Sequence, residues 1–160
     1  MSPMGADINN SRYIRFENTE FVGSKTASSA CYGINMNSGA TSPWACIFNG
    51  CLFTGNLYGA VVYGQDHVFG GCIFNYNGAY LGYAASGYDI GLNSGVTKTI
   101  INGCLFDNTI QPPSPTTGGV TYSIGIFSGA NYNLVANNIY HTALLNSGAG
   151  NLVTNNLGPI

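Results

Sequence analysis

Two aspartates, Asp89 and Asp107, have the chemistry of an enzyme active site among the six acidic residues of this chain. Hydrolysis of a glycosidic bond needs two carboxyl groups about 5 to 10 Å apart, one acting as acid and the other as base or nucleophile. Both aspartates flank the same edge of the repeat described below, one or two coils apart, and neighbouring coils are separated by about 4.8 Å. The sequence therefore predicts a candidate catalytic pair, with Asp89 as base and Asp107 as acid. Two aspartates that satisfy backbone amides are the simpler alternative.

Aromatic side chains form a second candidate group. Tyr76, Tyr80 and Tyr83 occur in one segment among asparagine and glycine residues, and Trp44 follows Pro43 at a corner. The flat faces of such rings stack on apolar surfaces, and sugar rings present surfaces of that kind. We predict these four aromatic residues as glycan-binding. Alternatively, the rings pack the segment onto the coil or onto a neighbouring subunit.

Other catalytic and metal-binding patterns are absent from the sequence. The five cysteines contain no paired CxxC arrangement, so no zinc site and no complete disulfide framework is indicated. His67 follows Asp66 at a tight corner, where we expect a buried structural histidine. No nucleophile elbow, phosphate-binding loop or HExxH motif occurs. We therefore predict neither a metal nor a cofactor.

The amino-acid composition limits the classes of protein to which this chain can belong. The chain has 160 residues, of which only 6% are charged and 45% are hydrophobic, so we expect an ordered protein. Four basic residues are too few to follow a phosphate backbone, and no apolar run approaches the roughly 20 residues of a membrane span. We predict no nucleic-acid partner and no membrane insertion. No signal peptide is seen at the N-terminus, so an extracellular protein would leave the cell by lysis, by another export route, or within a longer chain.

Two short phrases alternate along the chain. In the first, a bend residue and a small residue precede an apolar and an aromatic one, as in 48–53; the second opens with Tyr and ends in Ser-Gly, as in 88–95. The first recurs at 16–21, 48–53, 69–74, 101–106, 135–140 and 153–157, and the second at 32–39, 58–65, 88–95, 122–129 and 141–148. Strand periodicity with Gly or Asn at each bend is typical of a β-solenoid. We predict one all-β domain over 1–160, with an irregular lead-in at 1–12 and about five coils at 13–158.

The columns of the repeat predict which residues stack. The bend column contains residue types that tolerate a left-handed backbone. Its members are Asn18, Gly50, Gly71, Gly103, Asn137 and Asn155. The column after it includes Cys51, Cys72 and Cys104, which we expect to form a stack of buried thiols.

The first strand of each coil has two apolar faces, and its first copy decides which one is inside. One register buries Arg15 and Glu20, whereas the other buries Phe16 and Phe21, so we predict the phenylalanine register. It leaves a contiguous apolar face outside, which normally marks an interaction surface, so we predict a homo-oligomer. That face contains Ile47, Leu52, Val68, Ile73, Ile100, Leu105, Leu134 and Ile139.

The strand that opens with Tyr in each coil is predicted to have two columns of side chains that face the interior. They are Ile34, Ala60, Ile90, Ile124 and Ala143, then Met36, Val62, Leu92, Ile126 and Leu145. Two further columns are expected on a small, flat outer face: Gly33, Gly59, Asp89, Ser123 and Thr142, then Asn35, Val61, Gly91, Gly125 and Leu144. The connections that follow the aromatic residue vary widely in length, and this variable edge is where a solenoid often binds its ligand.

The asparagine, cysteine and phenylalanine repeat over residues 12 to 158 resembles the right-handed parallel β-helix of the pectin lyase-like superfamily. With its low charge, apolar outer face and lack of capping helices, the chain is most similar to a segment of a bacteriophage tailspike or tail fibre. The resemblance implies a homotrimer of a virion, located outside the cell, that contacts bacterial surface polysaccharide. We expect a structural, glycan-binding module of this kind, and the alternative is a polysaccharide depolymerase of the same fold, a glycoside hydrolase.

Overall fold

The structure is a computed structural model that describes residues 4–23, 31–36, 42–78, 87–107 and 120–158. These residues form strands and connections with no helix, and so none that could span a membrane. All strand pairs are parallel, and the strands make three sheets. The predicted all-β solenoid is confirmed. About five coils were predicted. Two of the sheets contain six strands and the third contains five, so the described residues form six coils, the last of them incomplete.

Each coil contributes at most one strand to each sheet. The first sheet consists of β1 (Met4–Ile8), β4 (Tyr32–Met36), β7 (Tyr58–Val62), β10 (Gly87–Leu92), β13 (Val120–Ile126) and β16 (Ala143–Asn146). The second consists of β2 (Arg15–Glu17), β5 (Ile47–Asn49), β8 (Val68–Gly70), β11 (Ile100–Asn102), β14 (Leu134–Ala136) and β17 (Leu152–Thr154). The third consists of β3 (Glu20–Val22), β6 (Leu52–Thr54), β9 (Ile73–Asn75), β12 (Leu105–Asp107) and β15 (Ile139–Tyr140).

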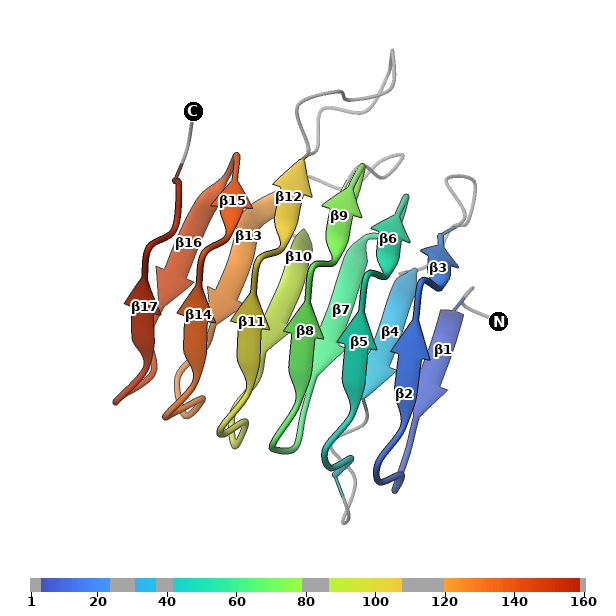
Figure 1. The fold of residues 1–160 in the computed structure, drawn as a ribbon, viewed down its shortest axis with the longest axis horizontal. Coiled ribbons are helices and arrows are strands. Elements are labelled where there is room, and N and C mark those ends of the chain that lie inside the picture. The colour runs from blue at the N-terminus through green and yellow to red at the C-terminus, as the bar shows by residue number, and fades with distance from the viewer. Residues whose placement is uncertain (1–3, 24–30, 37–41, 79–86, 108–119, 159–160) are drawn as a thin grey trace.

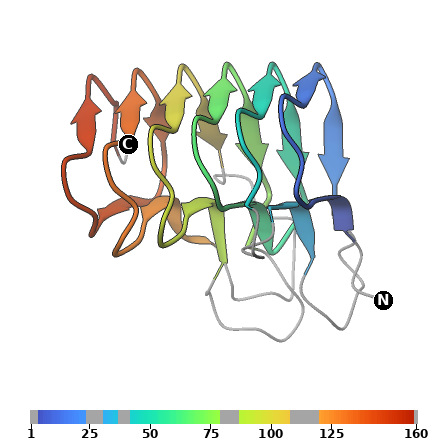
Figure 2. The same ribbon diagram turned by 90° about the horizontal axis from the view of Figure 1, so that it is seen from below.

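The coils wind in a right-handed sense. In Figure 1 the chain rises through β2 and β3 at the front and descends through β4 behind them, while successive coils advance from right to left. A chain that turns and advances in this way is right-handed, the hand that parallel crossover connections strongly prefer. Seen from below, the coils form a row of similar hoops (Figure 2).

A left-handed residue bends the chain between the second and third sheets in every coil. The residues at this bend have φ of 48° at Asn18, 62° at Gly50, 58° at Gly71, 65° at Gly103 and 53° at Asn155. Glycine and asparagine adopt this conformation most readily, which explains the composition of the column. The predicted bend column is confirmed.

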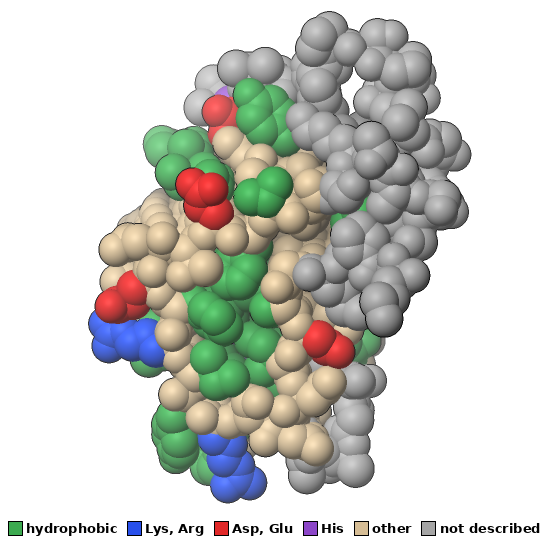
Figure 3. All heavy atoms as spheres, turned by 90° about the vertical axis from the view of Figure 1, so that its right-hand side faces the viewer, with side chains coloured by type: hydrophobic (Ala, Val, Ile, Leu, Met, Phe, Trp, Pro, Cys, Tyr) green, Lys and Arg blue, Asp and Glu red, His purple; other side chains and the backbone are tan. Residues whose placement is uncertain are grey.

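The interior contains the phenylalanine register that we predicted. Phe48 and Phe69 are fully buried, whereas Arg15 and Glu20 are exposed. The rings of Phe53 stack on those of neighbouring coils, with centroids 4.9 Å from Phe21 and 4.4 Å from Phe74. Seen along the coils from the N-terminal end, a band of hydrophobic side chains crosses the centre of the molecule (Figure 3).

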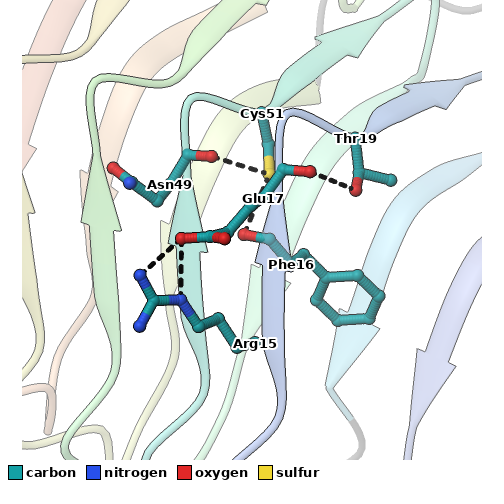
Figure 4. Close-up of polar contacts among 6 residues, drawn as sticks. All are labelled: Arg15, Phe16, Glu17, Thr19, Asn49 and Cys51. Carbon is teal, nitrogen blue, oxygen red and sulfur yellow. Dashed lines mark hydrogen bonds and ion pairs between the residues drawn. The ribbon is translucent and has the colours of Figure 1, made fainter.

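A column of thiols lies beside this stack, as predicted. The Sγ atoms of Cys51, Cys72 and Cys104 donate to backbone carbonyls of the preceding coil at 3.4 to 3.5 Å; Figure 4 shows this contact between Cys51 and the Phe16 carbonyl. Asn138 continues the column and donates in the same way to the Ile101 carbonyl at 3.1 Å. Burial raises the pKa of the Cys51 thiol, so it stays protonated and unreactive at neutral pH.

The structure contradicts the outer face expected for the first sheet in both columns, because Val61, Gly91 and Gly125 of the second column are buried as well as most of the first. Gly33, Gly59, Asp89 and Ser123 are buried rather than outward. A side chain added at Gly59 would lie 2.9 Å from the ring of Phe74, so this column points into the coil. The residues that follow, including Ala60 and Ile90, are fully buried too, so two successive residues of these strands face the interior.

The last coil is also shifted from its predicted register. Leu144, expected outside, pairs with Ile124 and packs against the core, whereas Ala143 is exposed. An irregularity between Tyr122 and Ile124 moves the pairing by one residue. A single-residue shift in a strand exchanges its two faces.

The bend column yields a test of the fold. Gly103 has φ of 65°, and a Cβ atom there would contact nothing within 4 Å, so only the backbone conformation opposes a side chain. We expect Gly103→Val to lower the free energy of unfolding by about 1 to 2 kcal/mol, measured by urea denaturation. Gly103→Asn is the matched control and should change stability little, because asparagine occupies the same column elsewhere. Equal losses for the two variants would contradict the assigned bend.

Candidate glycan-binding site

The two predicted catalytic aspartates lie in different surroundings. Asp89, on β10, is fully buried, and its Oδ1 accepts a hydrogen bond of 2.9 Å from Nδ2 of Asn77. Asp107, at the end of β12, is half-exposed, and its Oδ1 lies 3.8 Å from Nε2 of His141. The buried carboxylate has no surface to present to a glycan in this structure. That the two act as a catalytic pair stays a prediction.

The predicted aromatic residues also separate. Tyr80 and Tyr83 lie outside the described residues, and Tyr76, which follows β9, is half-buried with φ of 53°. Trp44 lies elsewhere, at the tight corner between the first and second sheets. The described part of the variable edge thus does not bring these rings together.

Trp44 belongs to a ladder of single residues, one from each of five coils. Isolated parallel bridges connect Arg12 to Trp44, Trp44 to Gln65, Gln65 to Thr97 and Thr97 to Asn131. Backbone hydrogen bonds support the ladder, including Trp44 N–H to the Ser11 carbonyl at 3.0 Å. Because adjacent coils keep the same register, the five side chains form one row, which we call the bridge row.

The indole of Trp44 is held from three sides. The guanidinium carbon of Arg12 lies 5.3 Å from its ring centroid, in the range of a cation–π contact. The ring of Tyr13 lies 6.3 Å away, and Nε1 donates a hydrogen bond to Oδ2 of Asp66. These contacts present a fixed aromatic surface with a cation beside it.

A second row of left-handed residues follows the bridge row. Its members have φ of 58° at Tyr13, 54° at Ala45, 60° at Asp66, 56° at Lys98 and 58° at Tyr132. None of these is glycine or asparagine, and the conformation costs most side chains about 1 to 2 kcal/mol. Asp66 is the exception, because aspartate, like asparagine, adopts it more readily. We call this the left-handed row. Sequence reasoning missed it because the residue types give no sign of a bend.

A cavity of about 370 Å³ opens beside these rows. Its lining comes from four successive coils and consists of Arg12, Ser42, Pro43, Trp44, Gly64, Gln65, Ser94 and Gly95. The site thus combines an aromatic face, a guanidinium, an amide and two hydroxyl groups. Such a lining suits a ligand with an apolar face and many hydroxyl groups.

His67 supports the corner from inside. Its ring is fully buried; Nδ1 accepts a hydrogen bond from the Cys46 backbone N–H at 3.2 Å, and Nε2 donates to the Tyr63 carbonyl at 2.9 Å. The ring is therefore neutral, with its proton on Nε2. Burial lowers the pKa of His67, although the nearby Tyr63 carbonyl and Asp66 oppose this effect. The prediction of a structural histidine agrees with this position.

Within the described residues, no group of three or more histidine, cysteine or acidic side chains is arranged to hold a metal ion. No protein-family model, curated protein sequence or solved structure matches the chain. The site is therefore interpreted from its own geometry.

The protonation state of His67 makes stability depend on pH. Its pKa in the folded protein lies below the ordinary value of 6.5, so the unfolded chain binds more protons as the pH falls through that value. His67 should therefore leave stability unaffected above about pH 7 and lower it progressively below about pH 6.5. We expect urea denaturation between pH 7.5 and 5 to show this loss.

His67→Asn is the matched variant, because asparagine performs the same task elsewhere in the column: Oδ1 of Asn133 accepts the Thr99 N–H at 2.9 Å. The variant should keep the hydrogen bond and lose most of the pH dependence between pH 7.5 and 5. An unchanged pH dependence would show that other groups are responsible.

Proposed function

We propose that this chain is a rigid β-helix module that binds bacterial surface glycans and assembles as a homotrimer, as phage tailspikes and tail fibres do. The observation that carries the proposal is the Arg12–Trp44 pair beside the corner cavity. The module would function on a virion, outside the cell. Its partners would be copies of itself and a polysaccharide.

The surface chemistry of the corner favours a sugar ligand. Trp44 offers a ring face, and the side-chain amide of Gln65 has no hydrogen-bond partner among the described residues. A sugar ring has an apolar face for the indole and hydroxyl groups for the amide. The indole position is defined by Asp66 and Arg12, so little side-chain motion has to be lost on binding.

The outward apolar columns favour self-assembly. Several of their side chains are substantially exposed, with Ile73 at 41%, Ile100 at 37% and Ile139 at 38%. They lie on the second and third sheets. The charged residues beside them are Arg15, Glu17 and Glu20 in the first coil and Asp107 at the end of β12. A continuous apolar face over several coils is best covered by further copies of the same chain.

Glycan binding is tested on an array of bacterial surface polysaccharides. We expect the protein to bind at least one of them and Trp44→Ala to weaken that binding about tenfold or more, which corresponds to about 1.4 kcal/mol. Trp44→Phe keeps a ring face and should retain part of the affinity. If the Trp44→Ala variant has the affinity and the melting temperature of the parent protein, the glycan does not bind at this corner.

Self-assembly is tested by light scattering after size exclusion. We expect the mass of a trimer, near three times 16.7 kDa. Ile100→Glu, in the exposed column of β11, should dissociate it by placing three like charges at the interface. Thr97→Glu, at the corner, is the control and should leave the mass unchanged. A monomer for the parent chain would contradict the proposed assembly.

A further inference from the structure

We infer that the tight corner is a track for a linear polysaccharide, which lies parallel to the coil axis and contacts one ridge residue after another from Arg12 to Tyr132. This inference rests on the proposed function, because it takes the ligand to be a glycan. The polysaccharide would run along the coil axis, extend over five coils and contact residues beyond Trp44. The bridge row and the left-handed row together are called the corner ridge.

The ridge repeats at the spacing of the coils. Its bridge row contains one residue from each of five successive coils, and parallel strands lie about 4.8 Å apart. This spacing is close to the length of one sugar unit in a linear chain. In each coil, one residue of the bridge row and one residue of the left-handed row can therefore contact one sugar unit of the polymer.

The cavity has the direction that such a track requires. It is bordered by Pro43 and Trp44 from one coil, Gly64 and Gln65 from the next, and Gly95 from a third. The hollow thus extends along the coil axis and across the boundaries between coils. A ligand filling it passes along the ridge and does not end at one coil.

Side chains of the ridge remain available to a ligand. Tyr13 is 75% exposed and Tyr132 is 71% exposed, one towards each end of the ridge. Among the described residues, the cationic groups of Arg12 and Lys98 have no ion-pair partner, and the hydroxyl of Thr97 makes no hydrogen bond. Rings, cations and neutral polar groups thus lie along the track, and the one carboxylate among them, Asp66, accepts the hydrogen bond of the Trp44 indole.

The backbone of the ridge argues against a purely structural role for these side chains. The other bend of each coil uses glycine or asparagine at the left-handed position. At the tight corner, Tyr13, Lys98 and Tyr132 adopt the same conformation with large side chains, while Gly150 occupies it in the last coil. Folding alone would favour glycine throughout, and strained residues of this kind concentrate at functional sites.

This backbone also permits a sharp test, because glycine should be tolerated structurally at these positions. The probes are linear fragments of increasing length, from disaccharide upwards, cut from the polysaccharide that binds best on the bacterial glycan array. We expect affinity to rise with length until the fragment spans the ridge and then to level off. Tyr132→Gly should lower affinity for the long fragments about fivefold or more and leave the disaccharide unaffected. Because glycine relieves the left-handed backbone at this position, the melting temperature should stay the same or rise.

Asn137→Gly is the matched control, since it makes the same backbone change at the other bend of the same coil, where φ is 56°, and it should bind like the parent. Disaccharide binding as tight as that of long fragments would overturn the track and leave glycan binding intact. The track would also be overturned if Tyr132→Gly kept the full length dependence. Binding to no polysaccharide on the array would overturn both the track and the proposed function.

Discussion

Two left-handed positions that recur in every complete coil are the constraint on which this structure depends. One lies at the bend between the second and third sheets and the other at the tight corner. Each turns the backbone sharply at a single residue. Because the same turn recurs in every coil, the coils stay in register and equivalent side chains lie above one another. The stacked phenylalanines, the thiol column and the bridge row are all consequences of this register.

The stacking also allows polar groups inside the coil. His67, Thr99 and Asn133 follow one another in a buried column, and the backbone N–H groups of Cys46 and Thr99 each donate to the side chain of the next coil. The same backbone-to-side-chain hydrogen bond thus forms in both places, with histidine as the acceptor in one coil and asparagine in another. The Thr99 hydroxyl is buried without a hydrogen-bond partner among the described residues, but the bonds from the Cys46 and Thr99 N–H groups connect neighbouring coils. These connections stiffen the corner that carries the ridge.

The sequence predicted the fold well and the site only in part. Alternation in the first strand and the exposed pair Arg15 and Glu20 were sufficient to assign the register, because hydrophobic burial dominates there. The inward turn of Asp89 was missed, since a buried carboxylate depends on a specific partner, Asn77. Trp44 was recognised, but not its row, because a left-handed backbone at Lys98 is unrelated to the preference of that residue type.

The central claim is that the tight corner is the surface that meets the glycan. A crystal structure of the protein with a bound oligosaccharide, taken from the best ligand on the bacterial array, tests it most directly. We expect sugar rings over Trp44 and along the ridge towards Tyr132. Sugar bound at the opposite, variable edge of the coils, with the ridge empty, would contradict it.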